Sequence, residues 1–397
     1  RKKVGMFIRL SLSEDKKGHH FCEYKPQHET RIVTTKPWSY KAPDHEVKEI
    51  SMGTMAQISD HKIQVSPIFK AWLYAKDRDI DTETTLETTA EGGAAAATSV
   101  AATATAEKSE RNITHVYFNC LVKHNSVGGR KGFLELPVEI GMTESLNQLE
   151  DSHPNIAVIT FPSDNGLMAK SMLTSEGLVR LKHAKERIID SALNNDNDFY
   201  ISDEIKRILF KDRDEPKKLR YLLVKSAQEL GLDGRTEITK AEQQALLFHF
   251  TKYEYTNYIL KTLNPDTFNM SCKDGIDRAG VASLYYNLIK SIELGKPITE
   301  DEFKKGLDAA PTMVKGRGMN HHREIIWNVI NNYINTNYDL IRAKCDWLIE
   351  WRNKNSIKVY QSTVQDFVVS DHVVGKETVD QNALSKIIYK NKSGSKW

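Results

Sequence analysis

The chain of 397 residues has few cysteines, no long apolar run and little net charge. Its four cysteines are Cys22, Cys120, Cys272 and Cys345, and they form no Cys-x-x-Cys pair and no metal-ligand pairing with histidine. This pattern argues against a disulfide framework and against a structural zinc site, and it fits a reducing compartment. We expect no cofactor and no metal ion.

The other absences narrow the choice of partners. No apolar run approaches the length of a membrane span. A net charge of +3 is too small for a chain that binds polyanions over its whole surface, so we expect no nucleic-acid partner. A local basic patch remains compatible with this charge. The balance of 40% hydrophobic and 27% charged residues is that of an ordinary globular protein, which we expect to be a monomer.

One segment stands apart in composition. Residues 82–108 are rich in Thr, Ala and Gly and contain no large aromatic residue, so they cannot bury enough apolar surface to offset their ordering entropy. We predict a flexible linker or loop at 81–110, with a surface Ala-rich helix as the alternative. The predicted organisation is an N-terminal β-rich part of the catalytic domain at 1–80, the linker, a catalytic core at 111–336 in which 200–262 could be a helical insertion, and a C-terminal region at 337–397.

The core alternates between strand-like and helix-like patterns. "HVYFNCLV" (115–122) and "IAVITF" (156–161) are rich in β-branched and aromatic residues, and the second is apolar enough for a strand buried on both faces. The turn "PSDNG" and a helix-like stretch to about residue 190 follow, and strand, turn and helix make the unit of a parallel sheet. We predict an α/β fold with a mixed central sheet flanked by helices and with helical additions.

The stretch "NMSCKDGIDRAGVASLYYNLIK" (269–290) joins a strand to a helix. Phe268, Met270 and Cys272 alternate as on one face of a strand, and apolar residues from 281 to 292 recur at helical spacing. Cys272 is therefore expected at the end of a strand and Arg278 at the start of a helix. The bare spacing of Cys, five residues and Arg is weak evidence, but this local structure strengthens it.

A loop of this kind suits phosphate chemistry. Amide groups and the helix N-terminus favour a dianion, and the same field lowers the pKa of a cysteine such as Cys272. A thiolate can take a phosphoryl group, while the fork of Arg278 grips the phosphate oxygens. Gly275 permits the turn, and Asp274 or Asp277 could protonate the leaving oxygen and then activate water.

These residues carry a family resemblance. The loop resembles the signature of Cys-x5-Arg phosphatases: "CKDGIDR" is similar to the myotubularin pattern Cys-x-Asp-Gly-x-Asp-Arg and to the "CKSGKDR" loop of bacterial effector and 4-phosphatase enzymes. With "HVYFNCLV", "AVITFPSDNGLM" and "VKGRGMNHHREI", the chain resembles the Legionella secreted phosphoinositide phosphatases of the SidF/SidP kind, the SidP pattern being the closer, over residues 111–336.

The resemblance implies a protein-tyrosine-phosphatase-like phosphate loop and a cysteine-dependent phosphoinositide phosphatase. It also implies secretion by the bacterium into the host cytoplasm, a peripheral place on host membranes and a phosphoinositide headgroup as partner. Lys273, Gly275 and Ile276 would contact the substrate. Ile276 stands where the SidF pattern has a second lysine, which favours the 3-phosphate of PI(3)P or PI(3,5)P2. Ala279 stands where the family usually has Thr or Ser, whose hydroxyl helps break down the phosphocysteine in many members. Its absence puts the rate or mechanism of that second step in question.

A second basic stretch, "VKGRGMNHHRE", precedes another predicted helix. Its basic residues would form a second anion-binding wall, and the alternative is a solvated basic loop. They are Lys315, Arg317, His321, His322 and Arg323. A metal is not expected there, because adjacent histidines on a helix point apart and no suitably spaced Cys or carboxylate accompanies them.

Two further residues have competing interpretations. Cys120 lies in an apolar strand and is expected in the core. Asp164 in "PSDNG" is expected to cap a helix, with a place in the site as the alternative. At the level of function, the alternatives to a phosphoinositide phosphatase are a lipid-binding pseudophosphatase module and a protein tyrosine phosphatase.

Overall fold

In the computed structural model, the residues described are 39–41, 46–50, 53–59, 62–67, 69–75, 112–123, 135–211, 214–273, 275, 277–313 and 321–355. The predicted linker at 81–110 lies outside them, as do 1–38 and 356–397. The strands are β1 (Ser39–Lys41), β2 (Glu46–Glu49), β3 (Ala56–Ser59), β4 (Lys62–Val65), β5 (His115–Asn119), β6 (Ile156–Thr160), β7 (Leu178–Arg180), β8 (Glu237–Thr239) and β9 (Thr267–Ser271). The helices are α4 (Glu135–Asn147), α5 (Leu149–Ser152), η1 (Gly166–Met168), α6 (Lys170–Thr174), α7 (Leu181–Leu193), α8 (Asp203–Phe210), α9 (Glu215–Glu229), α10 (Lys240–His249), η2 (Phe250–Tyr255), α11 (Thr256–Leu263), α12 (Arg278–Glu293), α13 (Glu300–Met313), α14 (His322–Thr336), α15 (Tyr338–Lys344) and α16 (Asp346–Lys354).

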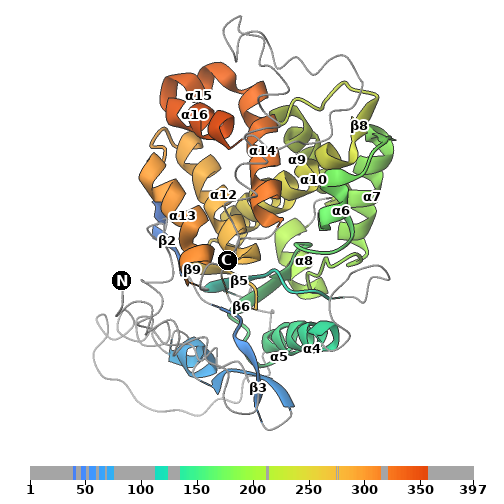
Figure 1. Ribbon diagram of the computed structural model, residues 1–397. Helices are drawn as coiled ribbons and strands as arrows, with labels where there is room; N and C mark the ends of the chain where they lie inside the picture. Colours follow the sequence, from blue (N-terminus) through green and yellow to red (C-terminus); the bar gives the residue numbers. More distant parts are fainter. Residues whose placement is uncertain are drawn as a thin grey trace, which may run out of the picture.

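The central sheet has the order β1-β2-β9-β5-β6. Its strands β2, β9, β5 and β6 run parallel to their neighbours, and β1 pairs antiparallel with β2. The predicted α/β fold with a mixed sheet is therefore confirmed. The last strand in the chain, β9, lies between β2 and β5 and so occupies the middle of the sheet (Figure 1).

Both faces of this sheet are covered. Along β5, Val116 and Phe118 belong to one apolar cluster, whereas Tyr117 belongs to the other. All five residues of β5, of β6 and of β9 are buried, as expected for parallel strands between two layers. The larger layer contains α7 to α12 and α14, and the smaller one contains α4, α5 and the β3–β4 hairpin (Figure 1).

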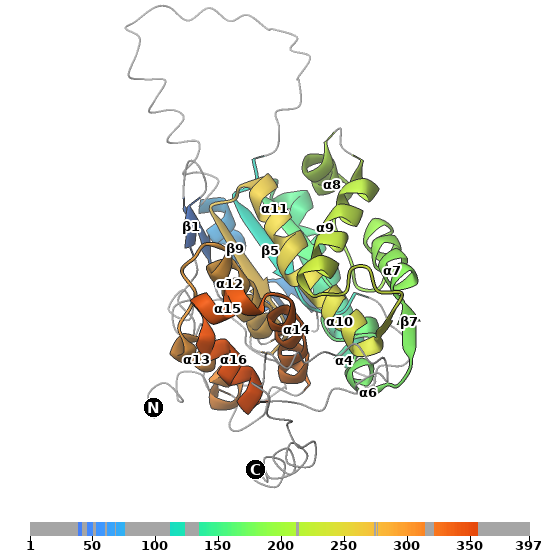
Figure 2. The same ribbon diagram turned by 90° about the horizontal axis from the view of Figure 1, so that it is seen from above.

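Helix α12 connects the middle strand of the sheet to the helical layer. Helix α12 follows β9 and packs against it, and α14 packs against both α10 and α12 (Figure 2). The region 200–262, considered as a helical insertion, contributes α8 to α11 to the same apolar cluster as β5, β6 and β9. These helices are therefore part of the main core.

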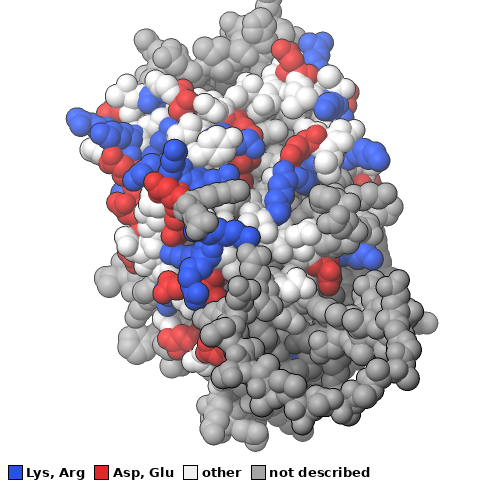
Figure 3. All heavy atoms as spheres, turned by 180° about the vertical axis from the view of Figure 1, so that it is seen from behind, with Lys and Arg blue, Asp and Glu red and all other residues white. Residues whose placement is uncertain are grey.

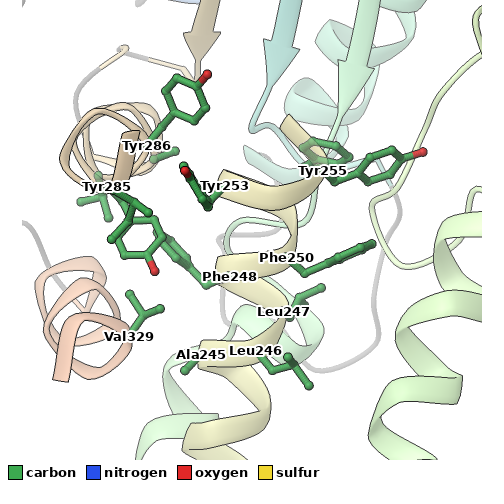
Figure 4. Packing of buried hydrophobic residues seen from close by; sticks show 14 of the residues in the cluster. Ala245, Leu246, Leu247, Phe248, Phe250, Tyr253, Tyr255, Tyr285, Tyr286 and Val329 are labelled. Atoms are coloured by element: carbon green, nitrogen blue, oxygen red, sulfur yellow. The ribbon is translucent and has the colours of Figure 1, made fainter. Parts of the chain in front are cut away.

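One long helix crosses this core in three parts. Thr239 and Glu242 form a capping box at the start of α10, and the helix continues through the π-helical turn η2 into α11. Every residue of η2 is buried. Phe248 and Tyr253 face Tyr285 and Tyr286 of α12, and Phe250 lies on the other side of the helix, stacked on Tyr255 (Figure 4).

The stretch after β6 differs from the single helix predicted there. It contains η1, α6, the short strand β7 and then α7. Helix α6 ends at Thr174, and Gly177, whose φ of +97° is a conformation open to glycine, directly precedes β7, which pairs with β8. A strand partner 60 residues downstream is a tertiary feature that local periodicity does not reveal.

The lengths of the helices and the charges on the surface show how the described residues compare with those of membrane proteins. Among the described helices, none has the length and apolar character needed to cross a bilayer. On the face seen in Figure 3, lysine and arginine side chains are interspersed with acidic ones. This described surface offers no extended face of a single sign.

Candidate active site

The candidate site lies at the carboxyl ends of three neighbouring parallel strands. Cys120 follows β5, Asp164 follows β6 by four residues, and Cys272 follows β9 directly. The amide of Cys120 donates to the carbonyl of Ser271 at 2.7 Å, so the two strand ends remain paired up to the first residues beyond them. Ligands of open α/β sheets bind at this edge.

The loop between β9 and α12 begins at Cys272, whose side chain is buried at 3% exposure. The Cys272 carbonyl accepts from the Gly275 amide at 3.1 Å, and Gly275 has φ +68°, which explains the glycine in the turn. Asp277 is buried and precedes α12 without capping it through its side chain. The predicted strand–loop–helix order is confirmed, while Asp274 and Ile276 lie outside the described residues.

Arg278 is held by a carboxylate from the other side of the sheet. Its two terminal nitrogens donate to the two oxygens of Glu139, in α4, at 2.9 and 3.0 Å. Burial lowers the pKa of Arg278, but the charge and hydrogen bonds of Glu139 outweigh it and the net pKa is raised. The guanidinium therefore stays charged, and three of its five N–H groups are not engaged by Glu139.

Asp164 does not have the capping role predicted for it. Asn165, not Asp164, occupies the N-cap position of η1, and no side-chain cap is formed there. Instead, Asp164 Oδ2 lies 3.8 Å from Arg278 Nη1, and Asp164 Oδ1 lies 3.6 Å from His321 Nε2. The turn after β6 thus directs this carboxylate into the site, which was the less favoured sequence interpretation.

The predicted second basic wall is described only in part. Lys315 and Arg317 lie outside the described residues. His321 reaches Asp164, and its pKa is lowered by burial, which outweighs the opposing charge of Asp164. Arg323 donates to Asn355 at 3.4 Å, beyond the end of α16.

The paired histidines do not point apart as expected. Their ring centroids lie 4.3 Å apart, because His321 precedes α14 and His322 is its first residue. Asp164, His321 and His322 offer ligand atoms within 4.8 Å of one another, a spacing that could hold a metal ion. Arg278 lies 3.8 Å from Asp164 and already supplies a positive charge there, so the donor set does not fit a metal ion well.

A buried lysine that the sequence did not single out completes the site. Lys252, in η2, is 3% exposed, and its Nζ donates to Ser163 Oγ at 2.7 Å and lies 3.8 Å from Cys120 Sγ. Burial lowers its pKa, and the charges of Cys120 and Cys272 act in the opposite direction. The sequence signal was a lysine within an otherwise apolar and aromatic helical face. The expected burial of Cys120 in the core is confirmed, at 2% exposure.

A separate cavity of about 500 Å³ adjoins the site. Pro162, Asn165 and Gly166 line it from the turn after β6, and Arg187 and Lys240 line it from α7 and α10. Neither Cys272 nor Arg278 is among its lining residues. The turn after β6 therefore separates this cavity from the cysteine loop.

The chain matches no family model, no curated protein and no solved structure. The arrangement of side chains at the strand ends is therefore the basis for assigning a function.

Proposed function

We propose that the chain is a cysteine-dependent phosphatase that hydrolyses phosphate monoesters of phosphoinositides without a metal ion. The observation that carries the proposal is the position of Cys272 at the end of β9 and of Arg278 at the start of α12, on the two sides of one short loop. A helix N-terminus and an arginine beside a cysteine suit a phosphate dianion.

The proposed reaction has two steps. The Cys272 sulfur attacks phosphorus, the bond to the inositol oxygen breaks, and an acid protonates that oxygen. Water then attacks the phosphocysteine, which releases inorganic phosphate and regenerates the thiolate. Arg278 stabilises the charge on the equatorial oxygens, and Glu139 fixes its orientation. Asp164 and Asp277 are described carboxyl groups suited to the proton transfers, and Asp274 remains a candidate from the sequence.

The choice of substrate rests on the sequence resemblance. The loop "CKDGIDR" favours the 3-phosphate of PI(3)P or PI(3,5)P2 as the substrate group. The proposed place of action is the membrane surface of a host cell, into whose cytoplasm a bacterium secretes the protein. A protein phosphotyrosine uses the same chemistry, so activity on a phosphotyrosine peptide above that on inositol lipids would redirect the assignment.

A binding module without turnover is the second candidate. Ala279 supplies no hydroxyl to the second step, the hydrolysis of the phosphocysteine. This residue favours a site that holds a headgroup without releasing phosphate.

Phosphate release decides between the two candidates. The full chain is assayed under reducing conditions against phosphoinositides that cover the ring phosphorylation patterns. We expect release from the 3-phosphorylated lipids and a loss of at least about 10³-fold in Cys272→Ser. Cys345→Ser is the matched control, because it removes another buried thiol, at the start of α16. Headgroup binding without release in the wild-type chain would support the binding module instead.

A further inference from the structure

The inference concerns Lys252 and the charge balance around Cys272. Lys252 and Lys290 are equally buried, at 3% exposure, and burial lowers the pKa of both. Lys290 Nζ meets Glu293 Oε2 at 3.1 Å and Asn257 Oδ1 at 3.0 Å. Lys252, in contrast, has no carboxylate within 4 Å among the described residues.

A buried ammonium without an anionic partner is costly. Burial of a charge costs several kcal/mol unless a counter-charge and hydrogen bonds compensate for it, so such a lysine points to an anion that binds nearby. The ammonium has three donors, of which Ser163 Oγ takes one at 2.7 Å and the Cys120 sulfur is a weak acceptor at 3.8 Å.

The fold places Lys252 at the strand ends for a definite reason. The π-helical turn η2 inserts an extra residue into the helix that runs from α10 to α11. Lys252 consequently lies against Ser163 and Cys120, beyond the ends of β6 and β5, rather than among the apolar partners of α12. Single π-helical turns inside long helices are frequent at functional sites.

The thiol of Cys272 lies next to Cys120 in the strand register. Asn119 pairs with Ser271, so Cys120 and Cys272 follow at the next step of the parallel pair. Both belong to the same apolar cluster as Phe118 and Met270, which shows that the two side chains lie on the same face of the sheet. Lys252 contacts Cys120 and therefore lies on that face, where the charge of Cys272 acts on it.

Arg278 leaves no net positive charge near Cys272, because two carboxylates face it. Arg278 is offset by Glu139 at 2.9 Å and also faces Asp164 at 3.8 Å. The titratable and charged groups that face Cys272 or its immediate partners are Tyr117 and Cys120 from β5 and its end, Glu139 from α4, Asp164 from the turn after β6, Lys252 from η2, Lys273 and Asp277 from its own loop, Arg278 from α12, and His321 before α14.

We propose that Lys252 is a positioning residue that supplies the positive charge needed to keep the Cys272 sulfur ionised. The inference rests on the proposed function for its biological meaning, because an ionised sulfur is the nucleophile of that reaction. Arg278, tied to Glu139, then serves mainly to orient the bound phosphate.

The test is the pH dependence of Cys272 alkylation in the absence of substrate. The full chain reacts with iodoacetamide across a range of pH, and mass spectrometry of the peptide that contains Cys272 gives the rate at that residue. The low exposure of the sulfur slows every reaction equally, so the midpoint of the profile reports its ionisation. In Lys252→Met we expect the midpoint to move up by about one pH unit or more, and the rate near neutral pH to fall about ten-fold.

Three further variants make the result specific. Lys290→Met removes an equally buried lysine outside the site, and its profile should match that of the wild type. Lys252→Arg retains the charge and should retain most of the wild-type midpoint. Where Lys252→Met does not fold, as judged by circular dichroism, Lys252→Gln provides the same measurement with a donor to Ser163 but no charge.

An unchanged midpoint in a folded Lys252→Met or Lys252→Gln protein would overturn the inference, and so would a shift of the same size in Lys290→Met. The proposed function has a separate readout. A shifted midpoint in a chain that releases no phosphate leaves the inference standing and the phosphatase assignment wrong. Phosphate release together with an unshifted midpoint would support the phosphatase assignment and overturn the inference about Lys252.

Discussion

The molecule contains two groups of ionisable side chains to which η2 contributes a residue, and the charges in the two groups are paired differently. In the helical layer, Lys225 meets Glu254 at 2.8 Å and His249 meets Glu229 at 2.7 Å, so each base has a carboxylate. At the strand ends, Arg278 faces two carboxylates and Lys252 faces none. In the first group, the cation Lys225 lies against two carboxylates. In the second, a buried lysine without a carboxylate within 4 Å lies beside the Cys120 thiol, as a site for an anion would require.

The group around Lys225 also contains three side chains spaced as metal ligands are, but a lysine already lies among them. Glu229, His249 and Glu254 offer ligand atoms within 4.8 Å of one another. Lys225 lies 3.5 Å from Glu229 and 2.8 Å from Glu254, and it occupies the place of a cation. Tyr285 closes the network with a hydrogen bond to His249. This arrangement explains the cluster as a structural one.

The largest expected effect on stability is at Arg278. Arg278→Ala removes the bidentate partner of the buried Glu139 and a charge near the partly buried Asp164, so the free energy of unfolding should fall by about 3–5 kcal/mol. Urea denaturation followed by circular dichroism measures this change. The double variant Arg278→Leu with Glu139→Leu, which removes both partners of the bidentate pair, should recover part of the loss. A loss below about 1 kcal/mol in Arg278→Ala would show that the pair is far more hydrated than its burial indicates.

The two buried lysines give the sharpest contrast between the groups. Lys290→Met deprives Glu293 and Asn257 of a donor and should lower the free energy of unfolding by about 1–3 kcal/mol. Lys252→Met removes an ammonium that has no carboxylate partner, and the Cys272 sulfur can take up a proton in compensation, so the free energy of unfolding should change by less than about 1 kcal/mol. The same urea titration, in buffer without phosphate, compares them. Equal losses in the two variants would mean that Lys252 is a structural residue like Lys290.

The smallest effect concerns pH and His321. Burial lowers its pKa in the folded chain, against the charge of Asp164, so the unfolded chain binds more protons at pH values just below about 6.5. The contribution of His321 to stability is therefore present above that pH and is lost as pH falls towards the folded pKa. His321→Asn should make the free energy of unfolding less dependent on pH between about 5 and 7. If the free energy of unfolding of His321→Asn depends on pH as steeply as that of the wild type, other groups cause the loss of stability at low pH.

Local patterns predicted the elements that carry the loop. Apolar runs identified β5 and β6, alternation identified β9, and helical spacing identified α12 and α14, because each of these signals lies within a few consecutive residues. The partners of the loop could not be predicted in this way. Glu139, Asp164 and Lys252 come from separate parts of the chain, and they meet Arg278 and Cys120 only because β9 is inserted beside β5 in the sheet.

The error at Asp164 has the same origin. A short polar residue after a strand and before a helix is a good cap by local criteria, and the sequence provides no local sign of Arg278 or His321. The interruption between the end of α6 at Thr174 and the start of α7 at Leu181 was also missed, because the stretch up to residue 190 retains helical residues on both sides of Gly177. Tertiary pairing decided both cases.

The extra residue in η2 sets the phase between the two halves of the long helix. Each residue turns an α-helix by about 100°, so α10 and α11 present their apolar sides to the core only with the wider turn between them. Deleting one residue within 250–255 would restore ordinary spacing but rotate one half against the other. Either the aromatic side of α10 would then turn away from the core, or Lys252 would turn away from the strand ends.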